Sequence, residues 1–119
     1  MESVRKLKYN EKSQYYDSTG LIISEIKDKC NIISVDSNNF EHSINDQPAF
    51  IHYFSSSFKK ISYKWWYKHG RPHRLTGPAY ISYRINGDIL TEKYYLNGKK
   101  LMKNDWNIEV NRIKMLNNL

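Results

Sequence analysis

The sequence predicts a mainly β protein, a meander of repeated antiparallel β-hairpins that ends in a C-terminal α-helix cap. Three observations support this fold class. A six-residue pattern occurs twice, at 48–53 (PAFIHY) and 78–83 (PAYISY), and an aromatic pair and a glycine follow each copy. Asn-Gly pairs punctuate runs of alternating apolar and polar residues, which is the pattern of hairpins. From residue 104 the apolar side chains recur at helical spacing instead.

The repeat defines the organisation of the chain. The two copies are offset by 30 residues, and the offset falls to 28 after the Ser55–Lys60 loop, while a partial third copy lies around Tyr16 and Gly20. Units repeated at this period stack, because one unit cannot bury its apolar face alone. We therefore expect a single domain over residues 1–119. Its parts would be divergent hairpins at 13–40, two repeats at 42–101 and a helix at 104–117.

The second repeat predicts the clearest hairpin. Residues 80–85 alternate as a strand, and residues 89–96 return. Between them, Asn86 and Gly87 both tolerate the positive φ that a two-residue type I′ turn requires. This turn would place Tyr80, Arg84 and Lys93 on the more polar of the two faces of the sheet. Asn97-Gly98 predicts another turn of this kind, followed by a short strand at 99–101.

The remaining chain completes the meander. The first repeat predicts strands at 50–54 and 61–67, and further strands are expected at 14–16, 21–26 and 31–35. Structural turns are expected at Gly20, Gly70, Asn86, Gly87, Asn97 and Gly98.

The C-terminal segment predicts a helix that covers the last edge or apolar face of the sheet. Its stripe consists of Trp106, Val110, Ile113 and Leu116, at i, i+4, i+7 and i+10. Asn104 or Asp105 is expected to cap the start of the helix.

Composition excludes several classes of protein. Cys30 is the only cysteine, so an intrachain disulfide and a thiolate zinc site are excluded, and we expect a small buried hydrophobe rather than a nucleophile. No apolar run approaches the roughly 18 residues of a membrane span, and no signal peptide follows Met1. These features predict a cytoplasmic protein that does not contact a membrane.

The second repeat resembles the MORN-variant repeats. The resemblance is carried by the opening at 73–79 (HRLTGPA), and then by Tyr83, Asn86-Gly87, Glu92, Tyr94-Tyr95 and Asn97-Gly98-Lys99. The first copy departs from the pattern, with Gln47 in the place of Gly77. These repeats occur in giant-virus and phage proteins and in bacterial antitoxin-like proteins. The resemblance implies a hairpin scaffold that serves as an interaction surface, encoded by a virus or mobile element and acting in the host cytoplasm or the virion.

One segment interleaves basic and aromatic side chains and is the candidate binding site. It spans residues 64–74 (KWWYKHGRPHR), in a chain of net charge +7. The repeat accounts for Trp66 and Tyr67 as core residues but not for Trp65, which we expect to be exposed as an interface anchor. Failing this, the binding surface would lie on the opposite face, around Tyr80, Arg84 and Lys93. The candidate binding residues are Lys64, Trp65, Lys68, His69, Arg71, His73 and Arg74.

The predicted function is a non-catalytic protein-binding module or inhibitor that docks another protein, with an acidic surface as the natural complement of the positive charge. One alternative is binding of single-stranded nucleic acid, in which charges track phosphates and rings stack on bases. Another is a structural or virion protein that assembles through its sheet edges. A further explanation of the surplus positive charge is a solvated, lysine-rich surface, which keeps exposed strand edges from pairing with other chains.

The sequence predicts neither an enzyme nor a cofactor. Paired carboxylates, a nucleophile elbow and a phosphate-binding glycine loop are missing from it. His69 and His73 stand four residues apart, but Gly70 and Pro72 between them indicate a turn, and no third ligand is near in sequence. We therefore expect no metal site, and the oligomeric state stays open.

Overall fold

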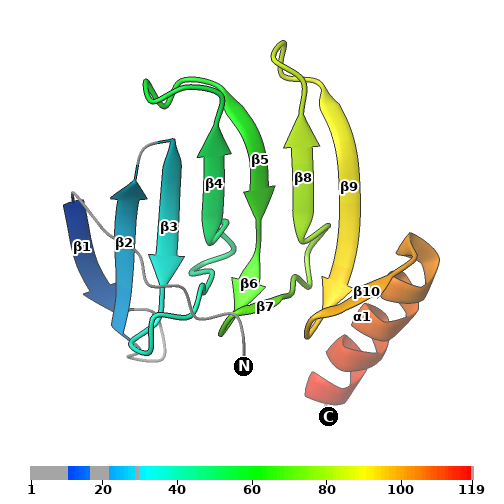
Figure 1. Ribbon diagram of the computed structural model, residues 1–119. Helices are drawn as coiled ribbons and strands as arrows, with labels where there is room; N and C mark the ends of the chain where they lie inside the picture. Colours follow the sequence, from blue (N-terminus) through cyan, green and yellow to red (C-terminus); the bar gives the residue numbers. More distant parts are fainter. Residues whose placement is uncertain (1–10, 17–21, 29, 119) are drawn as a thin grey trace.

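The computed structural model describes residues 11–16, 22–28 and 30–118, and the predicted turn at Gly20 lies outside them. Eight strands form one antiparallel sheet in which spatial neighbours follow chain order, while β6 and β7 form a separate small hairpin (Figure 1). The predicted mainly β meander is therefore confirmed. The strands are β1 (Glu11–Tyr16), β2 (Ile22–Asp28), β3 (Asn31–Val35), β4 (Phe50–Tyr53), β5 (Ile61–Trp65), β6 (Tyr67–Lys68), β7 (Arg71–Pro72), β8 (Tyr80–Tyr83), β9 (Ile89–Leu96) and β10 (Lys99–Leu101).

The β4–β5 and β8–β9 hairpins have the same register. Phe50 pairs with Trp65, and Tyr80, 30 positions after Phe50, pairs with Lys93, 28 positions after Trp65. In each hairpin the register shifts at the same place, just before the last pair at the loop end. The strand pairs of the two sequence copies therefore correspond one to one.

The loop at Asn86-Gly87 differs from the predicted two-residue turn. Of these two residues only Gly87 has a positive φ, of 96°. Its backbone N–H donates to the carbonyl of Arg84 at 2.9 Å, and the Arg84 N–H donates to the carbonyl of Asp88 at 2.8 Å. The loop thus has three residues and closes with a glycine in the left-handed region, a common alternative hairpin form.

Two other turns have the two-residue form. Asn97 and Gly98 have φ of 49° and 85° and join β9 to β10, as predicted. His69 and Gly70, with φ of 47° and 86°, join β6 to β7 in the same way. The predicted turn at Gly70 is therefore present as well.

The strand predicted at 61–67 is interrupted. β5 ends at Trp65, and the chain then leaves the sheet through the β6–β7 hairpin. The Trp66 side chain is 4% exposed, and its backbone N–H donates to the carbonyl of Ala79 at 2.7 Å. After Trp66, Tyr67 and Lys68 form β6, and the His69-Gly70 turn then reverses the chain into β7.

The C-terminal helix α1 (Lys103–Asn117) begins one residue earlier than predicted. Met102 is its N-cap residue and makes no side-chain capping bond, so the expected caps at Asn104 and Asp105 are wrong: both residues already lie in the first turn.

α1 lies beside β9 and β10, at one end of the sheet (Figure 1). Trp106 and Val110 are buried against Leu96, and the Trp106 ring lies 5.0 Å from that of Tyr94. Three members of the predicted stripe contact the sheet, while Leu116, near the helix end, is exposed.

Three small apolar clusters, rather than one central core, hold the described part of the sheet together. The buried members are Ile33, Val35 and Phe50 in the first cluster, Trp66, Ala79 and Ile81 in the second, and Leu96, Trp106 and Val110 in the third. Half-buried aromatic rings pack around each cluster, as expected of a thin sheet built from Tyr and Trp.

Candidate binding site

The structure separates the residues of the predicted binding segment. Neighbouring residues of a strand point to opposite faces, so Lys64 and Trp65 lie on different sides of β5. Lys68, His69 and Arg71 belong to the β6–β7 hairpin. The segment is therefore not one continuous site.

Trp65 is half-buried, and the expectation of an exposed anchor is wrong. Its ring centroid lies 4.5 Å from that of Tyr80 and 5.7 Å from those of Tyr67 and Tyr95. It also packs against the cluster of Ile33, Val35 and Phe50. The side chain is therefore part of an aromatic layer that several strands share.

We call this layer the aromatic face. Tyr63 stacks 6.0 Å from Phe50 and 4.8 Å from His52, and its ring lies 5.9 Å from that of Tyr80. Each of these aromatic pairs contributes about 0.5–1.5 kcal/mol beyond the area that it buries. The aromatic face consists of Phe50, His52, Tyr63, Trp65, Tyr80, Lys93 and Tyr95, and it crosses β4, β5, β8 and β9.

Tyr80 and Lys93 lie on the same side of the sheet as Trp65, not on the opposite one. Tyr80 is the cross-strand partner of both Trp65 and Lys93, and the Lys93 ammonium lies 5.0 Å from the Tyr80 ring. The expectation is wrong because the pairing of β5 with β8, which the local sequence does not specify, decides which residues of the two hairpins share a side.

Helix α1 packs against the other side of the sheet. Its contacts are with Tyr94 and Leu96, which alternate along β9 with the Lys93 and Tyr95 of the aromatic face. The described helix therefore leaves the aromatic face uncovered.

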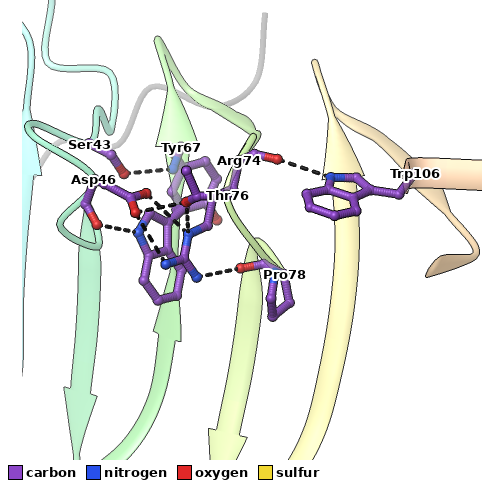
Figure 2. A network of polar contacts seen from close by, with 8 residues as sticks. Ser43, Asp46, Tyr67, Arg74, Thr76, Pro78 and Trp106 are labelled. Carbon is purple, nitrogen blue, oxygen red and sulfur yellow. Dashed lines mark hydrogen bonds and ion pairs between the residues drawn. The ribbon is translucent and has the colours of Figure 1, made fainter. Parts of the chain in front are cut away.

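Arg74 is held in a network of polar contacts (Figure 2). Its guanidinium donates to the Asp46 carboxylate at 3.1 and 3.4 Å, to the Thr76 hydroxyl at 3.1 Å and to the Pro78 carbonyl at 3.1 Å. It also stacks 3.7 Å from the Trp66 ring. Arg74 is thus a structural residue that ties the 43–47 loop to the segment before β8.

The network lowers the pKa of Asp46. Burial raises the pKa of this carboxyl, but hydrogen bonds from Arg74 and Thr76 and the Arg74 charge outweigh burial. The ionised carboxylate is therefore the form that the network stabilises.

His73 directly follows β7, and its ring bonds to the backbone of the β9–β10 turn. Its Nδ1 accepts the backbone N–H of Asn97 at 3.0 Å. His42, 31 positions earlier, makes the same contact with the N–H of His69 at 3.1 Å. Burial, and then the charge of Lys68, lower the pKa of His73, so the neutral ring that can accept this bond is favoured.

His69 lies beside Asp36 and His42 rather than His73. Its Nδ1 is 2.6 Å from Oδ2 of Asp36, and its ring is 4.2 Å from that of His42. One atom from each of the three residues could approach a metal ion, since these atoms lie within 4.8 Å of one another. However, the Nδ1 atoms of both histidines already take part in hydrogen bonds within the protein.

Lys68 and Arg71 are exposed, whereas Lys64 is half-buried. Lys68 and Arg71 line an open groove of about 370 Å³ beside Asp36 and Asn97. Lys64 lies with its ammonium 5.3 Å from the Tyr83 ring and 5.9 Å from the Trp66 ring.

Sequence reasoning missed the row of Tyr63, Tyr80 and Tyr95 as a shared surface. In the sequence, each of these residues is predicted only as an aromatic residue within a strand. The register between the strands brings the rings together. It also missed Asp46 and Asp36 as partners of basic residues, since 28 and 33 positions separate the members of these pairs.

No helix among the described residues is long and apolar enough to cross a membrane. In comparisons with known proteins, no family model matches the chain, and no curated protein or solved structure shows significant similarity to it.

Proposed function

We propose that this protein is a non-catalytic protein-binding module that docks its partner on the aromatic face. The observation that carries the proposal is the row of half-buried rings across four strands, on the side of the sheet that α1 does not cover. Tyr and Trp are enriched at protein interfaces because they supply a large, rigid contact area with a polar edge.

The charge of the protein supports an acidic partner. The chain carries 19 basic and 12 acidic residues, and Lys93 lies within the aromatic face itself. Charge of this sign speeds encounter with an acidic surface and disfavours basic competitors.

The proposal includes the likeness to MORN-variant repeats, and with it a viral or mobile-element origin and action in the host cytoplasm or virion. The common register of the β4–β5 and β8–β9 hairpins supports it, because stacked units of one kind must pair alike.

A charge reversal on the aromatic face tests the proposal. The wild type, Lys93→Glu and Lys99→Glu are compared as baits in a nuclease-treated cell lysate. Both variants change the net charge equally, but Lys99 is exposed at the β10 end of the sheet, opposite Leu96 and on the α1 side. We expect one retained protein that binds the wild type and Lys99→Glu but not Lys93→Glu.

Folding is checked by thermal melting. Lys99→Glu should melt within a few degrees of the wild type, because substitutions at exposed sites rarely change stability by more than about 0.5 kcal/mol. Lys93 is half-buried, and Lys93→Glu also loses the contact with the Tyr80 ring, which is worth about 1 kcal/mol, so this variant should melt somewhat lower but remain folded. Retention of the same proteins by Lys93→Glu would contradict the proposal, and so would proteins that the wild type retains only from a parallel lysate without nuclease.

A further inference from the structure

A second surface lies on the other side of the sheet, between the loop tips of two hairpins. The β4–β5 and β8–β9 loops enclose a groove of about 310 Å³. Four basic side chains line it, namely Lys59, Lys60, Lys64 and Arg84. Both loops lie at the same ends of the strands, at the top of Figure 1.

The positive charge of this groove is not neutralised locally. No carboxylate lines it, and within residues 30–118 neither Lys59, Lys60 nor Arg84 forms an ion pair. Asp88 belongs to the β8–β9 loop but does not line the groove, and its carboxylate accepts a hydrogen bond from the Asn86 side chain at 3.2 Å. Like charges gathered without a counter-charge create a potential that attracts an anion.

The walls of the groove are apolar. Ile61, Tyr83 and Ile85 line it together with the basic residues, and Ile85 is 59% exposed. Exposed apolar and ring surface beside several cations is the combination that single-stranded nucleic acids use, with phosphates on the charges and bases against the walls.

We propose that this groove binds the phosphate backbone of a single-stranded nucleic acid. The cations come from the β4–β5 loop, from β5 and from the β8–β9 loop rather than from one point, so they suit consecutive phosphates better than one small anion. The site shares only Lys64 with the segment at 64–74. It lies on the side of β5 opposite Trp65, so it is independent of the aromatic face.

The test compares two pairs of adjacent exposed lysines. Lys59→Gln/Lys60→Gln removes two charges from the groove, and Lys99→Gln/Lys100→Gln removes two from β10, outside it. Binding of a labelled oligothymidylate of about ten nucleotides is followed by fluorescence anisotropy over a range of salt concentrations.

Loss of two phosphate contacts should lower the slope of log K against log salt by about 1.4, at about 0.7 per contact on a single strand. The groove variant should bind about tenfold more weakly, whereas the β10 variant should change by less than about threefold. Arg84→Gln, on the opposite wall, should also weaken binding and provides a second variant should the first unfold.

Three results would contradict the proposed site. The first is a dissociation constant of the oligonucleotide for the wild type that is no lower than about 100 μM, the weak limit of non-specific association at physiological salt. The two lysine pairs could have equal effects, which would show a dependence on net charge alone. Inorganic polyphosphate of equal charge could bind as tightly as the oligonucleotide, which would show that bases do not contact the walls.

Discussion

At the scale of single residues, Gly87 shows how one position can depend on backbone conformation alone. Its φ is 96°, and a Cβ built there would meet no atom within 4 Å. We expect Gly87→Val to lose more than about 1 kcal/mol of unfolding free energy, because a β-branched residue resists positive φ. Gly87→Asn should lose less, since Asn tolerates this region better. Urea denaturation measures both losses. Equal stability of Gly87→Val and the wild type would refute the positive φ assigned to Gly87.

His73 makes the stability of the protein depend on pH. Its pKa lies below the ordinary value of 6.5 in the folded state, so the unfolded chain binds the proton more readily. The contribution of neutral His73 is therefore present above pH 6.5 and is lost as the pH falls from there through the folded-state pKa. We expect His73→Gln to lower the melting temperature more at pH 7.5 than at pH 5. The prediction fails if the two losses are equal.

At the scale of elements, Arg74 joins segments that the chain places far apart. Arg74→Ala removes the Asp46 contact, the hydrogen bond to the part-buried Pro78 carbonyl and the stack on the buried Trp66 ring. We expect a loss of about 1–2 kcal/mol, mainly from the stack and the Pro78 bond, because water replaces much of the contact with Asp46, whose side chain is 47% exposed. Arg71→Ala is the matched control, because Arg71 is an exposed arginine of the same segment and is not part of the network around Arg74.

Chemical denaturation of the two arginine variants provides the measurement. Arg71→Ala should stay within about 0.5 kcal/mol of the wild type. Arg74→Lys should recover little, because an ammonium cannot form the forked contact or stack in the same way. Equal losses for Arg71→Ala and Arg74→Ala would mean that the network of Figure 2 does not stabilise the fold.

At the scale of the whole molecule, the sheet is a row of units, and α1 closes one end of it (Figure 1). Trp106 connects this end to the interior, because its Nε1–H donates to the carbonyl of Arg74 at 3.0 Å and its ring packs on Tyr94. Since neighbouring units stabilise one another, we expect Trp106→Ala to cost about 3–5 kcal/mol and to destabilise the whole sheet.

Ile108→Ala on the same helix serves as the control, since Ile108 is 58% exposed. It should change the stability by less than about 0.5 kcal/mol. Circular dichroism of the strands and fluorescence of Trp65 and Trp66 should follow one transition in Trp106→Ala, at lower urea than in the wild type. Loss of helix signal without a shift of the strand transition would show that α1 is independent of the sheet.

The sequence by itself determined the features that depend on neighbouring residues. β9 and β10 have the predicted bounds, β3 matches 31–35, and Asn97-Gly98 forms the predicted two-residue turn. The helix and its stripe were predictable because strand alternation, turn propensity and helical spacing are local properties.

Only the tertiary structure decided which residues share a face or a contact. Trp65 joins Tyr80 through the pairing of β5 with β8, and Arg74 meets Asp46 across 28 positions. The register between strands also decided the form of the Asn86-Gly87 loop, through the bulge at its base. These features depend on how segments far apart in the chain pack together, and this packing cannot be predicted from the local sequence. The candidate binding surfaces, unlike the hairpins, therefore emerged only when the strands were assembled.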